Sequence, residues 1–263
     1  MCIAYLALGD PDWPLFIAAN RDEYHARPTA AAAPWAGRPD IISGLDLLAG
    51  GTWLGWTRAG RFALLTNYRE PAHHQPDAPS RGALVRDFLL DTGSAAAYAD
   101  EIMARCADYN GFNLIVGDGN EIRYLSNRDP QGRARLLAPG RYVLSNHLLD
   151  TPWPKAARLR AALDARPVSA LATDPDGVFA ILRDAEPAND TALPATGIPL
   201  ELERLLSSPF ILSPEYGTRC TTVIAAAADS HTLFSEQCYD PAGRACERHD
   251  WRIAPTGCVR PAR

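Results

Sequence analysis

The sequence predicts an α+β fold in which mostly antiparallel strands form layers and helices are inserted in blocks. Residues 2–8 and 15–20 are two almost continuously apolar segments, which the turn sequence GDPDWP separates. Residues 112–116 and 121–125 flank a glycine-rich turn at 117–120, which is typical of a tight hairpin. Because helical patterns occur in blocks between such strand pairs, the order indicates α+β layers and not a doubly wound parallel sheet.

The first strands are followed by a Pro/Ala-rich segment and then by a second hairpin. Residues 26–40 have turn chemistry, so we expect a loop there. Residues 52–57 and 61–67 are apolar strand segments around a short turn. We interpret Gly50-Gly51 as a tight bend before this hairpin and not as a phosphate-binding loop, since no GxGxxG or P-loop pattern follows a strand.

Two helices are expected after this hairpin, roughly at 81–91 and 95–106, with Ser80 and Ser94 as their N-caps. The later part of the chain repeats the alternation of helical patterns and strand segments. Further strands are expected near 141–145, 219–228 and 231–239, and further helices near 155–165, 175–185 and 200–206.

Composition excludes several classes of protein. The chain of 263 residues is 47% apolar and 22% charged, which is ordinary for a globular protein that needs no disulfides. Its net charge of −5 argues against a nucleic-acid-binding surface. No apolar run is long enough to span a membrane, and the first ten residues lack the basic region of a signal peptide.

The cysteines and histidines give no metal-binding pattern. Six cysteines are scattered without a CxxC pair, and six histidines form no HxxxH or HxH motif, so we expect no metal site. Since a secretory signal is also lacking, the thiols are expected to be reduced and the protein to be cytoplasmic.

Cys2 is the most informative residue of the chain. Removal of Met1 would leave a thiol and a free α-amine on the same residue, and both groups titrate close to neutrality. The amine can then act as the general base for its own side chain. The alternative is that Cys2 is an apolar residue that opens a buried strand, because free cysteine is often buried.

The first hairpin would bring charged residues to this cysteine. If its turn is centred in GDPDWP, antiparallel pairing sets Cys2 opposite Asn20, Arg21 and Asp22, with Glu23 next along the chain. A carboxylate there could hold the α-ammonium, and a guanidinium could lower the pKa of the thiol. Cys2 would then be the most reactive of the six cysteines. The alternative is a solvated turn cluster with its own salt bridges.

Several sequence blocks are shared with one family and run through almost the whole chain. They are M-C at 1–2, A-A-N-R-D-E-Y at 18–24, R-P-T at 27–29, G-G-T-W-L-G at 50–55, L-T-N-Y-R at 65–69, S-R-G at 80–82, Y-N-G-F-N-L at 109–114, L-S-N-H-L-L-D-T-P-W-P-K at 144–155, L-L-S-S at 205–208 and Y-G-T-R-C-T-T-V at 216–223. Together they resemble the NRDE family, whose eukaryotic members are called transport and Golgi organisation protein 2. This family is similar to the N-terminal-nucleophile hydrolases. The resemblance implies one domain over 1–263 with a four-layer αββα sandwich, two antiparallel sheets between helix layers.

Within that superfamily the chain resembles the cholylglycine hydrolase and penicillin V acylase group, which cleave amides with an N-terminal cysteine. The resemblance implies that Cys2 is the nucleophile and Asp22 the carboxylate that orients its amine. Asn67 matches the oxyanion-hole side chain of that group, Asn146 its other active-site asparagine and Arg219 its late arginine. Amide N–H groups suit the first of these roles because they stabilise a tetrahedral oxyanion.

One position departs from that group, which carries an arginine where this chain has Ala19; Arg21 lies two residues further on the same strand face. Two functions therefore remain open. The first is an amidohydrolase or acyltransferase that acts through an acyl-Cys2 thioester. The second is a carrier of haem or of an acyl lipid on the same fold, in which Cys2 or His25 could ligate haem iron. In either case a small-molecule or acyl-lipid ligand is expected, with Asn20, Arg21 and His25 in contact with it.

Overall fold

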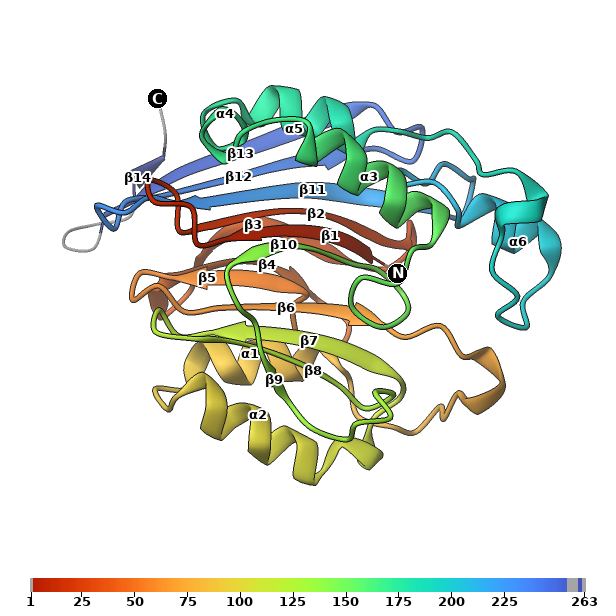
Figure 1. Ribbon diagram of the computed structural model, residues 1–263, viewed down its shortest axis with the longest axis horizontal. Coiled ribbons are helices and arrows are strands. Elements are labelled where there is room, and N and C mark those ends of the chain that lie inside the picture. Colours follow the sequence, from red (N-terminus) through yellow and green to blue (C-terminus); the bar gives the residue numbers. More distant parts are fainter. Residues whose placement is uncertain (1, 255–259, 262–263) are drawn as a thin grey trace.

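The computed structural model describes residues 2–254 and 260–261 of the chain. Over these residues, two seven-stranded antiparallel sheets face each other, and helices cover the outer face of each sheet (Figure 1). The predicted four-layer αββα sandwich is therefore confirmed. Among the described residues, no helix is long and apolar enough to cross a membrane.

The first sheet contains both ends of the described chain. In spatial order its strands are β10 (Gly140–Leu144), β1 (Cys2–Leu8), β2 (Leu15–Tyr24), β11 (Tyr216–Ala226), β12 (Thr232–Tyr239), β13 (Ala245–Ile253) and β14 (Arg260–Pro261). The second sheet runs in sequence order. Its strands are β3 (Thr29–Trp35), β4 (Arg38–Asp46), β5 (Leu54–Thr57), β6 (Phe62–Asn67), β7 (Phe112–Gly117), β8 (Ile122–Ser126) and β9 (Arg135–Leu136).

The expectation of a loop over 26–40 is wrong, because β3, the turn that follows it and the start of β4 lie there. Alanine and proline are poor strand formers, and this composition hid the strand. β3 is the outermost strand of its sheet, where Pro34 is tolerated because one side of the strand needs no ladder hydrogen bond. Strands β4, β9, β13 and β14 were also not predicted.

The helices form two outer layers. α3 (Pro154–Asp164), α4 (Val168–Thr173) and α5 (Pro175–Leu182) cover the first sheet, and α1 (Gly82–Leu90) and α2 (Ala95–Ala104) cover the second (Figure 1). α6 (Leu200–Leu205) lies beyond the strand ends (Figure 1). Three short 3-10 helices are η1 (Pro71–His73), η2 (Cys106–Asp108) and η3 (Asp190–Ala192). The expected helices are present; α4 was not predicted.

Only one of the two predicted N-caps is found. The Ser94 hydroxyl accepts a hydrogen bond from the Ala97 amide at 3.1 Å and caps α2. α1 has Arg81 at its N-cap position, with no side-chain capping bond, so Ser80 is not the cap. The cap position of α1 is therefore occupied by a long cationic side chain.

Strands β1 and β2 are buried on both faces, as their nearly continuous apolar sequence predicted. Ala4, Leu6 and Ile17 point into the core between the sheets. Tyr5 and Phe16 point to the other side and pack under α3 and α5. Because side chains alternate along a strand, the polar residues that continue β2 beyond residue 19 are also divided between the two faces.

Candidate active site

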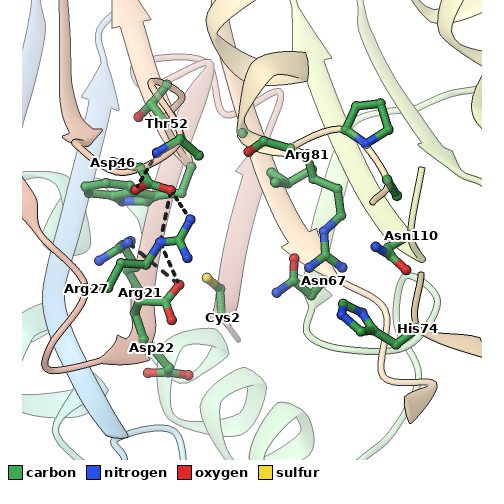
Figure 2. Close-up of a pocket in the computed structure, with 18 of the residues that line it drawn as sticks. Cys2, Arg21, Asp22, Arg27, Asp46, Thr52, Asn67, His74, Arg81 and Asn110 are labelled. Atoms are coloured by element: carbon green, nitrogen blue, oxygen red, sulfur yellow. Dashed lines mark hydrogen bonds and ion pairs between the residues drawn. The ribbon is translucent and has the colours of Figure 1, made fainter. Parts of the chain in front are cut away.

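Cys2 lies opposite Arg21 in the β1–β2 pairing, as the turn position predicted. Its carbonyl oxygen accepts a hydrogen bond from the Ser145 hydroxyl at 3.3 Å. The cysteine lines a cavity of about 300 Å³ together with Arg21, Asp22 and Asn67. Figure 2 shows Cys2 in the middle of this cavity, with Arg21 and Asp22 on one side and Asn67 on the other.

Asp22 is buried at the end of the same hairpin. Its Oδ1 accepts a hydrogen bond from the Thr218 hydroxyl at 2.7 Å. Burial raises the pKa of this carboxyl group above its ordinary value, because the charged form loses its hydration. An ionised Asp22 therefore depends on nearby positive charge.

Arg21 is the cation next to the thiol on the inner face of the sheet. Its guanidinium stacks over Trp53, 4.2 Å from the ring centroid, and donates to the Thr29 hydroxyl at 3.2 Å. Glu23 lies 3.8 Å from it. These contacts fix Arg21 in the wall of the cavity. Ala19, two residues earlier on the same face of β2, is packed in the core between the sheets.

The expectation of a lowered pKa for the Cys2 thiol is wrong in the 263-residue chain. Burial is the largest effect and raises the pKa of Cys2, although Arg21 acts in the opposite direction. Among the described cysteines, Cys246 on β13 is the exposed one. Cys258 lies outside the described residues. Cys2 is only partly exposed and its pKa is raised, so Cys246 replaces Cys2 as the residue expected to react first.

Asn67 is the last residue of β6 and reaches the cavity from the second sheet. Its side-chain amide makes no hydrogen bond to any described residue, and it lines the cavity that contains Cys2. An amide with free N–H groups beside a thiol suits the predicted oxyanion-hole role, which stays a prediction.

Asn146 is fully buried, and its amide is already engaged. Its Nδ2 donates to the Asn67 carbonyl oxygen at 3.0 Å, and its Oδ1 accepts from the Lys155 ammonium at 3.1 Å. Its backbone oxygen accepts from the Arg69 amide at 2.8 Å. Asn146 therefore holds the end of β6 in place and leaves Asn67 as the side chain that faces the thiol.

Two of the three predicted ligand-contacting residues do not line the cavity. Asn20 faces the helix layer, where its Nδ2 donates to the carbonyl oxygens of Leu182 and Pro209, both at 2.9 Å. His25 follows β2, and its Nε2 lies 3.1 Å from the Ser213 carbonyl oxygen. Side chains alternate along β2, so Asn20 faces the opposite side of the sheet from Arg21. His25 lies beyond the end of β2, where the chain has left the hairpin.

Arg219 also lies outside the lining of the cavity. Its Nη1 donates to the carbonyl oxygens of Tyr24, His25 and Arg27 at 2.9, 3.3 and 3.3 Å. The residue sits at a bulge of β11, where the pairing with β2 shifts by one position. The bulge directs the guanidinium to the connection after β2, so Arg219 fixes this connection and does not contact the thiol site.

Sequence reasoning missed Arg81, the N-cap residue of α1. Its Nη1 donates to the Gly111 carbonyl oxygen at 2.8 Å, and the guanidinium points toward Asn67 inside the cavity (Figure 2). No described acidic side chain forms an ion pair with it, and burial lowers its pKa. Arg81 thus brings a positive charge to the cavity from the start of α1, in addition to Arg21 on β2 and to Arg27, which is paired with Asp46. The S-R-G block at 80–82 was the available signal.

The close contact between Gly51 and Gly82 sets the position of Arg81. The bend Gly50-Gly51 is present as predicted, with Gly50 at φ +68° and its amide donating to Asp46 O at 2.8 Å. A Cβ added at Gly51 would lie 2.5 Å from the carbonyl carbon of Gly82. Only glycine therefore lets the bend touch the first turn of α1, which carries Arg81.

A second and larger cavity adjoins the first. It has a volume of about 750 Å³, and much of its wall is apolar, from Ile198, Leu202, Leu205 and Leu206. The residues that line both cavities are Asn67, His74, Arg81 and Asn110. The polar cavity with the thiol and the apolar cavity therefore meet at the end of β6.

A buried ion pair holds the helix that forms this apolar wall. Arg69 Nη1 lies 2.6 Å from Glu203 Oε2, and the guanidinium stacks 4.8 Å from the centroid of Trp153. Glu203 also accepts a hydrogen bond from the Thr196 amide at 3.0 Å. α6 is thus fixed to the end of β6 by a desolvated charge pair and not by surface contacts alone.

The sequence as a whole matches a known protein family. The model of the family described as Transport and Golgi organisation 2 matches residues 1–241. The chain belongs to this family. The Transport and Golgi organization protein 2 homolog of Bos taurus is 36% identical over 279 residues, covering 96% of this chain and 99% of the relative. The Homo sapiens homolog is 35% identical over 260 residues, covering 90% and 92%.

A solved structure of low sequence identity has a similar fold. The Caenorhabditis elegans ortholog of N-acylethanolamine-hydrolyzing acid amidase has a TM-score of 0.52 and 13% identity, and the match covers 87% of this chain and 95% of that one. The predicted likeness of this family member to N-terminal-nucleophile hydrolases is therefore confirmed for the fold.

Proposed function

We propose that this protein is an N-terminal-cysteine acyl-transfer enzyme, an amide or thioester hydrolase or an acyltransferase, whose acyl group is carried on Cys2. The observation that carries the proposal is the meeting of the two cavities at the end of β6. Cys2 and Asn67 line the polar cavity, and Asn67 also lines the apolar one. A substrate with an acyl chain in the larger cavity would present its carbonyl carbon to the thiol.

The chemistry requires the form of the chain that lacks Met1. The Cys2 α-amine would then take the thiol proton, and the ionised Asp22 would hold the resulting ammonium. Arg21, on β2, and Arg81, at the start of α1, would stabilise the thiolate. These charges would counter the burial that raises the pKa of Cys2 in the 263-residue chain.

The reaction proceeds in two steps. The Cys2 sulfur adds to the carbonyl carbon, and Asn67 donates to the oxygen that becomes negative. The bond from this carbon to the leaving nitrogen or sulfur breaks, and the leaving group takes the proton from the ammonium. Water, or a second acceptor with a hydroxyl or amine, then attacks the Cys2 thioester and returns the thiol.

Intact-mass spectrometry tests the proposal. The protein is prepared with Met1 removed and the removal is verified by mass, then incubated with a long-chain acyl thioester and with the corresponding acyl amide. We expect a mass increase of one acyl group, absent in Cys2→Ala and retained in Cys246→Ser. Loss of the adduct in Cys246→Ser, or no adduct with either substrate, would contradict the proposed function.

A carrier of an acyl lipid is the second candidate, favoured by the size and the apolar wall of the larger cavity. Such a carrier would bind a fatty acyl amide at saturation whether or not Met1 is present, and would form no adduct. For haem, Cys2 would have to supply the axial ligand, because His25 Nε2 lies 3.1 Å from the Ser213 carbonyl oxygen and His25 lines neither cavity. Titration of both forms of the protein with the acyl amide and with haem separates these cases.

A further inference from the structure

The single lysine of this chain is buried beside the thiol site. Lysine and arginine together number 26, and Lys155 is the only lysine among them. It lies in the first turn of α3 and is 1% exposed. Lysines are almost never fully buried without a partner. Arginine keeps its proton in proteins, whereas a buried lysine can release it. The one lysine side chain of the sequence therefore lies at this site.

The direct contact of Lys155 is with the site and not with an acid. Its Nζ donates to Asn146 Oδ1 at 3.1 Å, and no described acidic side chain forms an ion pair with it. The charged or titratable groups around it are Arg69, Asp22, Cys2 and Glu203. They come from the segment after β6, from β2, from β1 and from α6.

Asp22 is the acidic group whose ionised form the Lys155 ammonium can stabilise. Glu203 is already paired with Arg69 at 2.6 Å, so its charge is largely compensated. Asp22 is buried at the same strand ends, its Oδ1 accepts a hydrogen bond from the Thr218 hydroxyl, and the Lys155 ammonium is one of the positive charges that favour its ionised form. Burial lowers the pKa of Lys155 to about 8 and raises that of Asp22, so each group holds its charge more readily when the other is charged.

We propose that Lys155 is a positioning residue of the Cys2 centre: its hydrogen bond orients Asn146, which holds the end of β6 with Asn67, and its ammonium helps to keep Asp22 ionised. This inference deepens the proposed function and rests on it, because that function identifies the Cys2 centre as the site of the reaction. The coupling of Lys155 to Asp22 is a property of the folded protein and is measured without turnover.

Because Lys155 is the only lysine, one isotope-labelled amino acid reports on it alone. The protein is grown with lysine labelled with carbon-13 at Cε, and the single side-chain resonance is followed by NMR from pH 6 to pH 11. We expect a midpoint near pH 8, well below the value of about 10.4 for a free lysine.

Two matched carboxylate variants test the partner. Asp22→Asn removes the coupled anion and should lower the Lys155 midpoint by about one unit. Asp229→Asn removes an exposed carboxylate at the β11–β12 turn and should leave it unchanged. A wild-type midpoint above pH 10, or equal midpoints in the two variants, would overturn the coupling.

The effect on the site is read from the pH profile of thiol alkylation. In Lys155→Met, loss of the ammonium should move the alkylation midpoint of Cys2 to higher pH and leave that of Cys246 unchanged. Equal shifts at both cysteines, or none, would refute the positioning role, and if this variant does not fold, the wild-type and Asp22→Asn titrations still decide. A missing acyl adduct with intact coupling would contradict only the proposed function, and an adduct without coupling only this inference.

Discussion

Replacement of Lys155 by methionine should change how the stability of the fold depends on pH. Methionine has a similar length and no charge, so the variant removes the ammonium from a site that is 1% exposed and leaves the site filled. The pKa of Lys155 is about 8 in the folded protein and about 10.4 in the unfolded chain. Between these values the unfolded chain binds more protons than the folded protein. The free energy of unfolding therefore rises with pH in this window.

The size of the effect follows from the two pKa values. At pH 7 the lysine is almost fully protonated in both states, and at pH 10 it is neutral only in the folded one. The linkage relation then gives a gain of about 2.5 kcal/mol for the wild type between pH 7 and pH 10. Methionine at this position has no such gain, so the difference between the two proteins should change by this amount.

Urea denaturation of both proteins at pH 7, 8, 9 and 10 measures this difference. Other groups also make the free energy of unfolding depend on pH, since burial raises the pKa of Tyr98 and of Cys238. Their contributions are common to the wild type and the variant and cancel in the comparison. Reducing agent is kept constant throughout, because the described cysteines are free thiols.

A difference between the two proteins that does not change with pH would refute the reasoning. It would mean that Lys155 keeps its proton to the same pH when folded as when unfolded. The stabilising influence of Asp22 and Glu203 would then offset the effect of burial. A decrease with pH would show a raised pKa and a stronger ion pair than the geometry indicates.

Three further predictions concern the site. In the form without Met1, Asn67→Ala should lower kcat on an acyl thioester about 10²–10³-fold with little change in KM, whereas Asn110→Ala, in the same cavity walls, should lose far less; equal losses would contradict the oxyanion role. Gly51→Ala should destabilise the fold by about 1–3 kcal/mol, because the new Cβ meets the backbone of α1 at 2.5 Å; an unchanged melting temperature would oppose this. In the 263-residue chain, limiting iodoacetamide followed by peptide mapping should modify Cys246 before Cys2, and the reverse order would mean that the nearby arginines outweigh burial.

Local sequence determined the framework of the first hairpin. The turn GDPDWP sets the pairing of β1 with β2, so the opposition of Cys2 and Arg21 follows from counting residues on either side of the turn. Strong apolar segments and turn glycines indicate most of the other strands. β3 was not predicted because its alanines and proline have no local preference for a strand. Its pairing with β4 makes it a strand.

The direction of each side chain at the strand ends was decided by tertiary structure. Asn20, Arg21 and His25 lie close together in sequence, yet alternation along β2 and the turn after it direct them to three different surroundings. The bulge in β11 likewise turns Arg219 away from the thiol. Sequence spacing fixes which residues are neighbours along the chain and not which of them share a cavity.

The charges of the site depend most on tertiary packing. Arg81 and Lys155 are far from Cys2 in the sequence, and the meeting of two sheets and two helix layers brings them to it. That Lys155 is the only lysine is visible in the sequence. Its burial, its hydrogen bond to Asn146 and its lowered pKa are not, because desolvation is a property of all the elements packed around the ammonium.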